Sequence, residues 1–156
     1  MQLTDILARD RIGADVRVSS KKRLLELLAS LLAGDLGGAV ERAIFDALDA
    51  REHLGSTGLG RGVAIPHGRV GGNLPPTAAF VRLRSPIEFG APDGEAVDLV
   101  LALVVPDHFT DQHLTLLAEV AELFSHAEIC EELRAAGDAQ QLFERISRRT
   151  LQFSEV

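Results

Sequence analysis

VDLVLALVV, residues Val97 to Val105, is the segment around which the rest of the sequence can be arranged. It is almost wholly apolar and rich in valine and leucine, as expected of a central strand whose two faces are both covered. Its apolar run is far shorter than the roughly 20 residues that a membrane-spanning helix needs, and it stops at Pro106. The segment therefore predicts the middle strand of a sheet with helices packed on both faces.

Segments on either side supply these helices and further strands. Apolar side chains recur at helical spacing, and serine, threonine or aspartate precedes several of these runs as an N-cap. Helices are expected after Ser19 or Ser20, over Ala39–Ala50, after Thr110 or Asp111, over Ala127–Ala135 and over Asp138–Arg148. Strands are expected over Ala78–Leu83, over Val63–Ile65 with an end at Pro66, and in IGADVRV near the start. The chain is predicted to form an α/β fold, a single-domain sandwich over residues 1–156, with a small mixed β-sheet flanked by helices on both faces.

The composition excludes several classes of protein. The 156 residues suit one domain of ordinary size, and 46% of them are hydrophobic. The formal net charge is −7, with charges of both signs scattered along the chain, whereas a nucleic-acid-binding surface needs clustered lysine and arginine. The N-terminus has no hydrophobic signal region, and the single cysteine, Cys130, is expected to fill the core of a protein kept in a reducing compartment. We expect a cytoplasmic protein that binds no nucleic acid and does not insert into a membrane.

The segment RGVAIPHGR, Arg61 to Arg69, places a histidine between a proline and a glycine. Seven of the fourteen glycines of the chain lie between Gly55 and Gly72, so this is also its most glycine-rich part. Proline cannot continue a strand ladder, and glycine allows a close approach of the backbone. His67 is therefore presented by backbone geometry directly after a strand, which favours a chemical role.

The other histidines differ in their surroundings. His53 and His126 have no polar cluster around them in the sequence, so a surface or capping role is expected. His113 follows the central strand much as His67 follows its own strand, and α/β folds place their sites at such loops. His67 and His113 are thus either a functional pair or two independent structural histidines. His108 lies close enough to His113 in the sequence for either one to enter a site at this strand end.

Spacing disfavours several kinds of site. A zinc site would need three or more convergent ligands and a local signature such as His-Glu-x-x-His, which is absent. LGSTGLG has the wrong spacing for the Gly-x-Ser-x-Gly turn of serine hydrolases, and no lysine follows it as a P-loop requires. Its backbone N–H groups and the hydroxyls of Ser56 and Thr57 are suited to hold an anion. A histidine nucleophile beside such a loop, with an arginine at hand, is consistent with transient phosphorylation of the imidazole.

REHLGSTGLGRGVAIPHGR, followed by PIEFG, VDLVLALVVP and HLTLL, resembles the enzyme IIA domains of the bacterial phosphoenolpyruvate-dependent phosphotransferase system, in its fructose–mannitol–nitrogen class. The resemblance extends over roughly Leu3–Ile146. It implies that His67 is the phosphoryl acceptor, that His113 rather than His108 is the second site histidine, and that Arg51 is the site arginine. The uninterrupted GSTGLG is more similar to the nitrogen-type regulatory branch than to the sugar carriers.

The resemblance implies phosphotransferase chemistry that needs neither a metal nor a cofactor. Neutral His67 would attack a phosphoryl group carried by a histidine phosphocarrier protein, while His113 and Arg51 would stabilise the charge on the moving group. Further phosphoryl-binding residues would come from the glycine-rich segment: Ser56, Thr57 and Gly68.

Two outputs are consistent with this chemistry. A nitrogen-type protein would regulate partner proteins, such as transporters or kinases, according to its phosphorylation state. A sugar-specific component of the fructose or mannitol type would instead pass the phosphoryl group to a IIB domain for sugar uptake. No IIB or membrane domain is attached in this sequence, which favours the regulator. A third class, a non-catalytic interaction module, is disfavoured because Arg51, His67 and His113 are all present.

Overall fold

The computed structural model describes residues 1–154, with side chains described up to residue 150, and it is built on a six-stranded sheet. The strands are β1 (Leu7–Val16), β2 (Gly58–Gly60), β3 (Val63–Ala64), β4 (His67–Val70), β5 (Thr77–Ile87) and β6 (Val97–Pro106). Their order across the sheet is β1-β5-β6-β3-β2, and β4 pairs with β6 further along the same edge as β3. β5 runs antiparallel to β6 whereas β3 and β4 run parallel to it, so the sheet is mixed as predicted.

β6 is the middle strand that the sequence predicts. Each of its residues except Asp98 is buried. Because successive side chains of a strand point to opposite faces, β6 contributes to two separate apolar clusters. Leu99, Leu101, Leu103 and Val105 belong to one cluster, and Val100, Ala102 and Val104 belong to the other.

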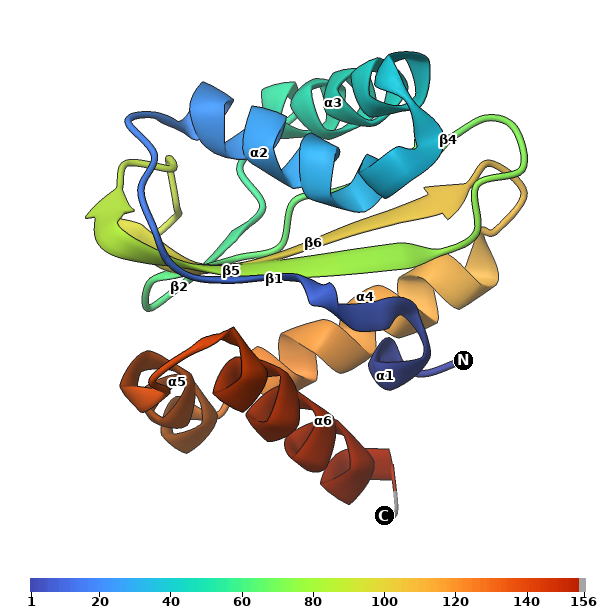
Figure 1. Cartoon of the computed structure of the whole chain (residues 1–156). Helices are drawn as coiled ribbons and strands as arrows, with labels where there is room; N and C mark the ends of the chain where they lie inside the picture. Colours follow the sequence, from blue (N-terminus) through green and yellow to red (C-terminus); the bar gives the residue numbers. More distant parts are fainter. Residues whose placement is uncertain (155–156) are drawn as a thin grey trace.

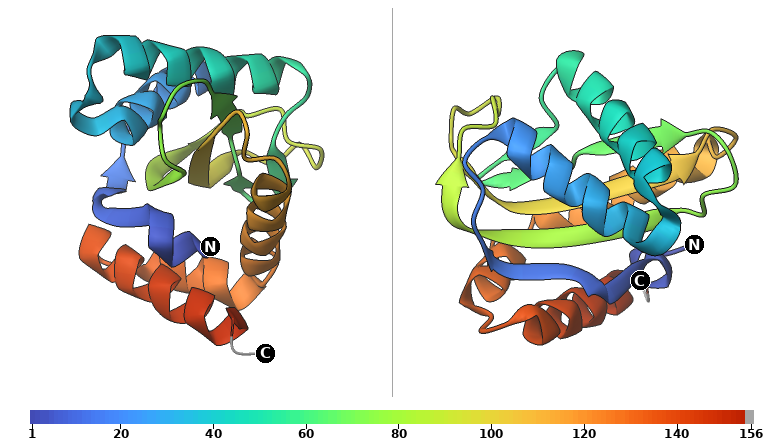
Figure 2. Two further views of the ribbon diagram at one scale, coloured as in Figure 1. Left: turned by 90° about the vertical axis from the view of Figure 1, so that its right-hand side faces the viewer. Right: turned by 45° about the horizontal axis from the view of Figure 1, so that its top comes forward.

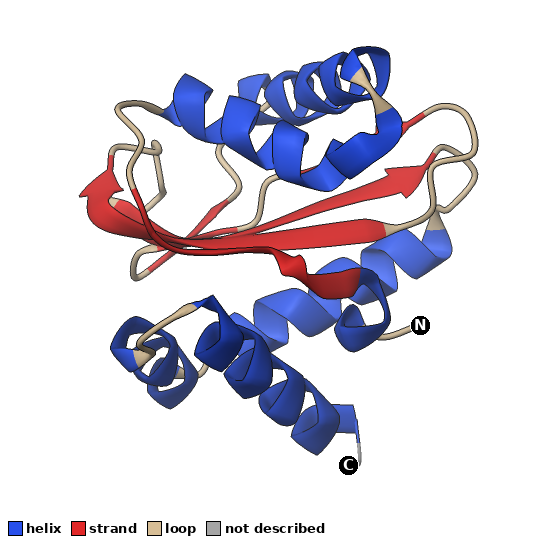
Figure 3. Cartoon of the chain, viewed as in Figure 1, coloured by secondary structure: helices blue, strands red, loops and turns tan. Residues whose placement is uncertain are grey.

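Helices cover both faces of the sheet (Figures 1 and 3). α2 (Lys21–Ala33), the 3₁₀ turn η1 (Gly34–Leu36) and α3 (Gly38–His53) lie over one face. α1 (Leu3–Ile6), α4 (Asp111–Phe124), α5 (Ala127–Ala135) and α6 (Ala139–Ser154) lie over the other. Figure 2 shows the same three layers from two further directions, which confirms the predicted α/β sandwich. Within residues 1–154, no helix is long and apolar enough to cross a membrane.

One element boundary lies where it was expected, and two others differ from their expected positions. Ser20 is the N-cap of α2, since its hydroxyl accepts a hydrogen bond from the Arg23 amide at 3.2 Å. The strand expected in IGADVRV begins earlier, at Leu7, because β1 continues along β5 through two irregularities in register. α3 continues to His53, three residues past its expected end, because the first strong helix breaker in this part of the chain is Gly55.

The strand around His67 corrects one expectation. A strand was expected to end at Pro66, but β4 begins at His67 and pairs with Leu103 to Pro106 of β6. Pro66 has no N–H and so interrupts the ladder, but its carbonyl accepts a hydrogen bond from the Leu103 amide at 3.0 Å. The chain therefore continues to hydrogen-bond to β6. His67 is the first residue of a strand rather than the residue after one.

Gly68 brings β4 into direct contact with α3. The residue is buried, and a Cβ atom added to it would lie 3.0 Å from the Cβ of Ala47 and 3.1 Å from the Ala47 carbonyl carbon. Real Cβ atoms rarely approach other atoms so closely, so a side chain here would push the strand and the helix apart. The glycine thus holds β4 against the helix that ends next to the glycine-rich loop.

Candidate functional site

His67 is half-buried at the start of β4, and one of its ring nitrogens is held by the backbone. Nδ1 lies 2.8 Å from the carbonyl oxygen of Ile65. A carbonyl oxygen only accepts hydrogen bonds, so Nδ1 carries the proton and Nε2 keeps its lone pair. Burial lowers the pKa of His67, and the positive charges of Arg51 and Arg69 lower it further. The hydrogen bond to Ile65 and the charge of Glu52 raise the pKa, but the net shift is downward. The neutral ring therefore presents Nε2 as a nucleophile.

His113 faces His67 from the first turn of α4. The centroids of the two rings are 5.5 Å apart and their planes make an angle of 76°. The structure thus brings together two histidines that the sequence left as either a pair or two independent residues. His108 is instead exposed in the turn between β6 and α4.

The ring of His113 is buried without hydrogen bonds. Only 4% of the residue is exposed, and neither ring nitrogen has a hydrogen-bond partner within the described part of the chain. Burial, followed by the charges of His67 and Arg69, lowers the pKa of His113 to about 4. A buried polar group without a partner costs about 1–3 kcal/mol. A site that leaves two such nitrogens in the ring beside His67 is therefore suited to a group that binds there transiently.

Two arginines supply positive charge beside the histidines. Arg51, in the last turn of α3, donates a hydrogen bond from Nη1 to the Gly55 carbonyl at 2.8 Å. Arg69 follows His67 by two residues on β4, so strand alternation places it on the same face. Neither guanidinium has a carboxylate partner among the described side chains. Both are available to a small anion.

The Gly55–Gly58 loop is tied to the protein through its hydroxyl groups. The Ser56 hydroxyl donates to the Phe89 carbonyl at 3.2 Å and accepts from the Gly58 amide at 3.0 Å. Thr57 donates to Glu52 through both its hydroxyl and its amide, the latter at 3.1 Å. The two hydroxyls expected to bind a phosphoryl group are therefore engaged with protein acceptors in this structure.

Two residues near the site were not expected from the sequence. Glu52 is buried and occupies the next position of the stripe that Ile44 and Leu48 form on α3 at four-residue spacing. A glutamate in a buried stripe is a signal that can be found by extending the helix past residue 50. Arg69 is placed beside His67 only if the strand is continued beyond Pro66.

The other histidines and the cysteine are as expected. His53 is exposed and lies 2.7 Å through Nδ1 from the Asp49 carbonyl, at the end of α3. His126 occupies the N-cap position of α5, with Glu122 and Glu128 near its ring. Cys130 is buried in the core. Among the described residues, no group of three or more histidine, cysteine, aspartate or glutamate side chains could hold a metal ion.

These features together define a class of site. A neutral histidine with one free nitrogen faces a second neutral histidine, beside two guanidinium groups that have no carboxylate partner among the described side chains. This arrangement suits the transfer of a small anionic group onto an imidazole. Comparison with known proteins places the chain more narrowly. The family model described as "Phosphoenolpyruvate-dependent sugar phosphotransferase system, EIIA 2" matches residues 5–149, and the chain belongs to this family of phosphotransferase-system components.

Individual relatives point to one branch of this family. The nitrogen regulatory protein of Pseudomonas aeruginosa is 42% identical over 144 residues, which cover 92% of this chain and 94% of that protein. The crystal structure of the nitrogen regulatory protein IIA-Ntr from Neisseria meningitidis matches with a TM-score of 0.85 at 42% identity, covering 92% of this chain and 97% of the other. The IIA mannitol structure from Escherichia coli shares the fold alone, with a TM-score of 0.73 at 17% identity over 88% and 96% of the two chains.

Proposed function

We propose that the protein is a nitrogen-type IIA component that accepts a phosphoryl group on His67 from a histidine phosphocarrier protein and regulates partner proteins according to its phosphorylation state. The observation that carries this proposal is the facing pair of His67 and His113, with Nδ1 of His67 bonded to the backbone. Membership of the EIIA 2 family and the likeness to nitrogen regulatory proteins support it.

The transfer step is a displacement at phosphorus. The Nε2 lone pair of neutral His67 attacks the phosphoryl group on the imidazole of the donor protein. The new N–P bond forms as the N–P bond of the donor breaks, and the donor ring takes back the bonding electron pair. Nδ1 stays protonated and donates its hydrogen bond to the Ile65 carbonyl throughout the step. His67 therefore needs no separate base. Because such transition states are loose, the site has mainly to orient the two rings and stabilise negative charge.

The charge on the moving group is stabilised by donors around His67. Arg51 offers guanidinium N–H groups, and His113 offers one ring N–H at the positive end of the α4 dipole. Ser56 and Thr57 contribute by fixing the glycine-rich loop around the phosphoryl group, since their hydroxyls have protein acceptors. Gly68 contributes by letting β4 pack on α3.

Regulation follows from the charge that His67 gains. A phosphoryl group adds close to two negative charges, at a site where neither Arg51 nor Arg69 pairs with a carboxylate of the described residues. Docking of a partner, such as a transporter or a kinase, is then weakened by repulsion and desolvation or strengthened through its own arginines. Binding of such a partner therefore depends on the phosphorylation state of His67.

A transfer assay tests the acceptor. The protein is incubated with phosphoenolpyruvate, the general phosphotransferase enzyme and a histidine phosphocarrier protein. We expect one acid-labile phosphoryl group, absent in His67→Ala and present in the control His53→Ala, whose ring lies on the surface. Labelling of His67→Ala would show that another residue is the acceptor.

A second arm separates the regulator from a sugar-specific component. The labelled protein is mixed with IIB domains of the fructose and mannitol types. A regulator keeps its label under these conditions. Rapid loss of the phosphoryl group to one IIB domain would replace the regulatory proposal with a role in sugar uptake.

A further inference from the structure

Glu52 is a buried carboxylate outside the pair of histidines. Only 3% of its side chain is exposed. An ionised carboxylate is retained in such a position only when hydrogen bonds and an opposite charge replace the lost water. Its partners therefore indicate what it holds in place.

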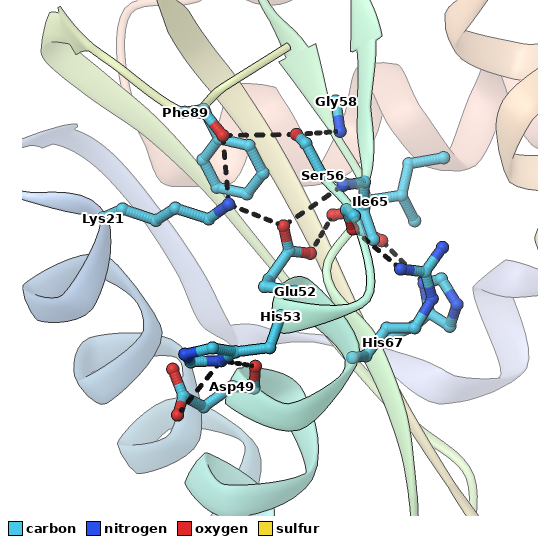
Figure 4. A network of polar contacts seen from close by, with 12 residues as sticks. Lys21, Asp49, Glu52, His53, Ser56, Gly58, Ile65, His67 and Phe89 are labelled. Atoms are coloured by element: carbon cyan, nitrogen blue, oxygen red, sulfur yellow. Dashed lines mark hydrogen bonds and ion pairs between the residues drawn. The ribbon is translucent and has the colours of Figure 1, made fainter. Parts of the chain in front are cut away.

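These partners belong to the loop and to the start of α2. The Glu52 carboxylate accepts hydrogen bonds from the amide and the hydroxyl of Thr57, and its Oε1 lies 2.8 Å from Nζ of Lys21. Lys21 also donates to the Phe89 carbonyl at 3.0 Å and lies 4.1 Å from the centre of the Phe89 ring. Figure 4 shows Glu52 between Lys21 and the segment that carries Ser56 and Gly58. The carboxylate thus ties the loop to α2, α3 and the segment after β5.

Hydrogen bonds connect this loop to His67 on one side and to Arg51 on the other. The Thr57 carbonyl accepts a hydrogen bond from the Ile65 amide at 3.1 Å, and the Ile65 carbonyl in turn accepts from Nδ1 of His67 at 2.8 Å. On the other side, Arg51 donates to the carbonyl of Gly55 at 2.8 Å. The loop therefore has a fixed place relative to His67, and the Arg51 guanidinium is docked on that loop.

We propose that Glu52, with Lys21 as its counter-ion, is a positioning residue for phosphoryl transfer. Glu52 holds the Gly55–Gly58 loop in place, and this loop in turn holds the guanidinium of Arg51 beside His67. This inference rests on the proposed function. Glu52 touches neither the donor nor the phosphoryl group; it acts through Arg51. Its loss affects the transfer rate while the docking surface for the donor is retained.

The experiment measures a single turnover of transfer from the phosphorylated phosphocarrier to the wild type, Glu52→Gln, Arg51→Ala and the double variant. A displacement of about 1 Å at a reacting centre costs on the order of 10²-fold in rate, so we expect Glu52→Gln to slow transfer by about 10-fold or more. The donor concentration at half-saturation stays unchanged. In the Arg51→Ala background, Glu52→Gln produces less than about a twofold further loss, because coupled residues are not additive.

Asp98→Asn is the matched control. Asp98 is a partly buried carboxylate, 21% exposed, that pairs with Arg134 at 2.9 Å far along β6 from the histidine pair. Its neutralisation removes an ion pair outside the site, so transfer proceeds at the wild-type rate. Folding of each variant is checked by its NMR amide spectrum. If Glu52→Gln does not fold, Thr57→Val removes one donor to the same carboxylate, and the same Arg51-dependent loss is expected.

The outcomes separate this inference from the proposed function. If the wild type accepts no phosphoryl group, the proposed function fails. If the wild type is phosphorylated and Glu52→Gln, or Thr57→Val in its place, transfers at the wild-type rate, the positioning role is wrong. An equal loss in the presence and absence of Arg51 would likewise overturn it, since the effect would then not pass through the guanidinium.

Discussion

At His67 the backbone determines which ring nitrogen keeps a free lone pair. The bond from Nδ1 to the Ile65 carbonyl fixes one tautomer, and burial keeps the ring neutral. His113 is neutral for the same reason of burial, but its nitrogens have no partner among the described residues. The two rings therefore have different parts in the proposed transfer: His67 accepts the group, and His113 stabilises it.

Replacing His113 should slow transfer without preventing folding. Loss of one charge-stabilising donor costs on the order of 10²-fold in rate, so His113→Ala is expected to lower the single-turnover rate by about that factor. His108→Ala, which changes an exposed ring in the turn before α4, is the control and should transfer at the wild-type rate. The reverse result would show that His108 is the second site histidine.

His113 should also make the protein sensitive to acid. Its pKa in the folded state is about 4, below the ordinary 6.5. Between these values the unfolded state binds more protons, so stability that is present above pH 6.5 is lost as the pH falls toward 4. Relative to pH 7.5, the ring lowers the free energy of unfolding by about 2 kcal/mol at pH 5.

Urea unfolding of wild type and His113→Leu at both pH values measures this effect. His113→Leu should lose less stability on acidification than the wild type by about 2 kcal/mol. His53→Ala, which removes a surface histidine, should follow the wild-type curve. Parallel curves for wild type and His113→Leu would mean that His113 is not held neutral by burial.

Among the elements, β4 and α3 are in close contact directly beside His67. Gly68 faces Ala47 so closely that an added Cβ would meet both its side chain and its backbone. Gly68→Ala is expected to lower the free energy of unfolding by about 1–3 kcal/mol, as for other overpacked sites. It should also shift the NMR signals of His67.

Gly38→Ala is the matched control for this prediction. Gly38 begins α3, and a Cβ there would meet nothing within 4 Å. Alanine at this position should be neutral or slightly stabilising because it restricts the unfolded chain. Equal stability of Gly68→Ala and Gly38→Ala would mean that β4 does not need close contact with the helix.

The elements also show where sequence reasoning succeeds and where it stops. The run of valine and leucine in β6 and the periodic helices are local patterns, and they predicted the layers of the fold. The pairing of the chain with β6 beyond Pro66 was not predicted, because a proline, which has no N–H, usually marks the end of a strand. The carbonyl of Pro66 nevertheless accepts a hydrogen bond from β6. The burial of Glu52 has a local signal, since it continues the buried stripe of α3. Its ion pair with Lys21 joins residues distant in the sequence and has no local signature.

For the whole molecule, the resemblance in the glycine-rich segment predicted the family, and the match over residues 5–149 bears it out. The rule that α/β folds place sites at strand ends made a pair of His67 and His113 one of two alternatives, and the structure shows the two rings together, from β4 and α4. Under the proposed function, which partners respond to the phosphorylated form depends on surfaces outside this chain. The position of the phosphoryl group itself depends only on the site described above.

NMR of the phosphorylated protein, with ¹⁵N in its histidine rings, measures that position directly. The protein is charged by the phosphocarrier and kept at a pH where phosphohistidine is stable, and the coupling between phosphorus and ring nitrogen identifies the bonded atom. We predict a single phosphoryl group on Nε2 of His67, with Nδ1 still protonated and bonded to Ile65. A phosphoryl group on Nδ1 of His67, or on His113, would contradict the assignment of the nucleophile.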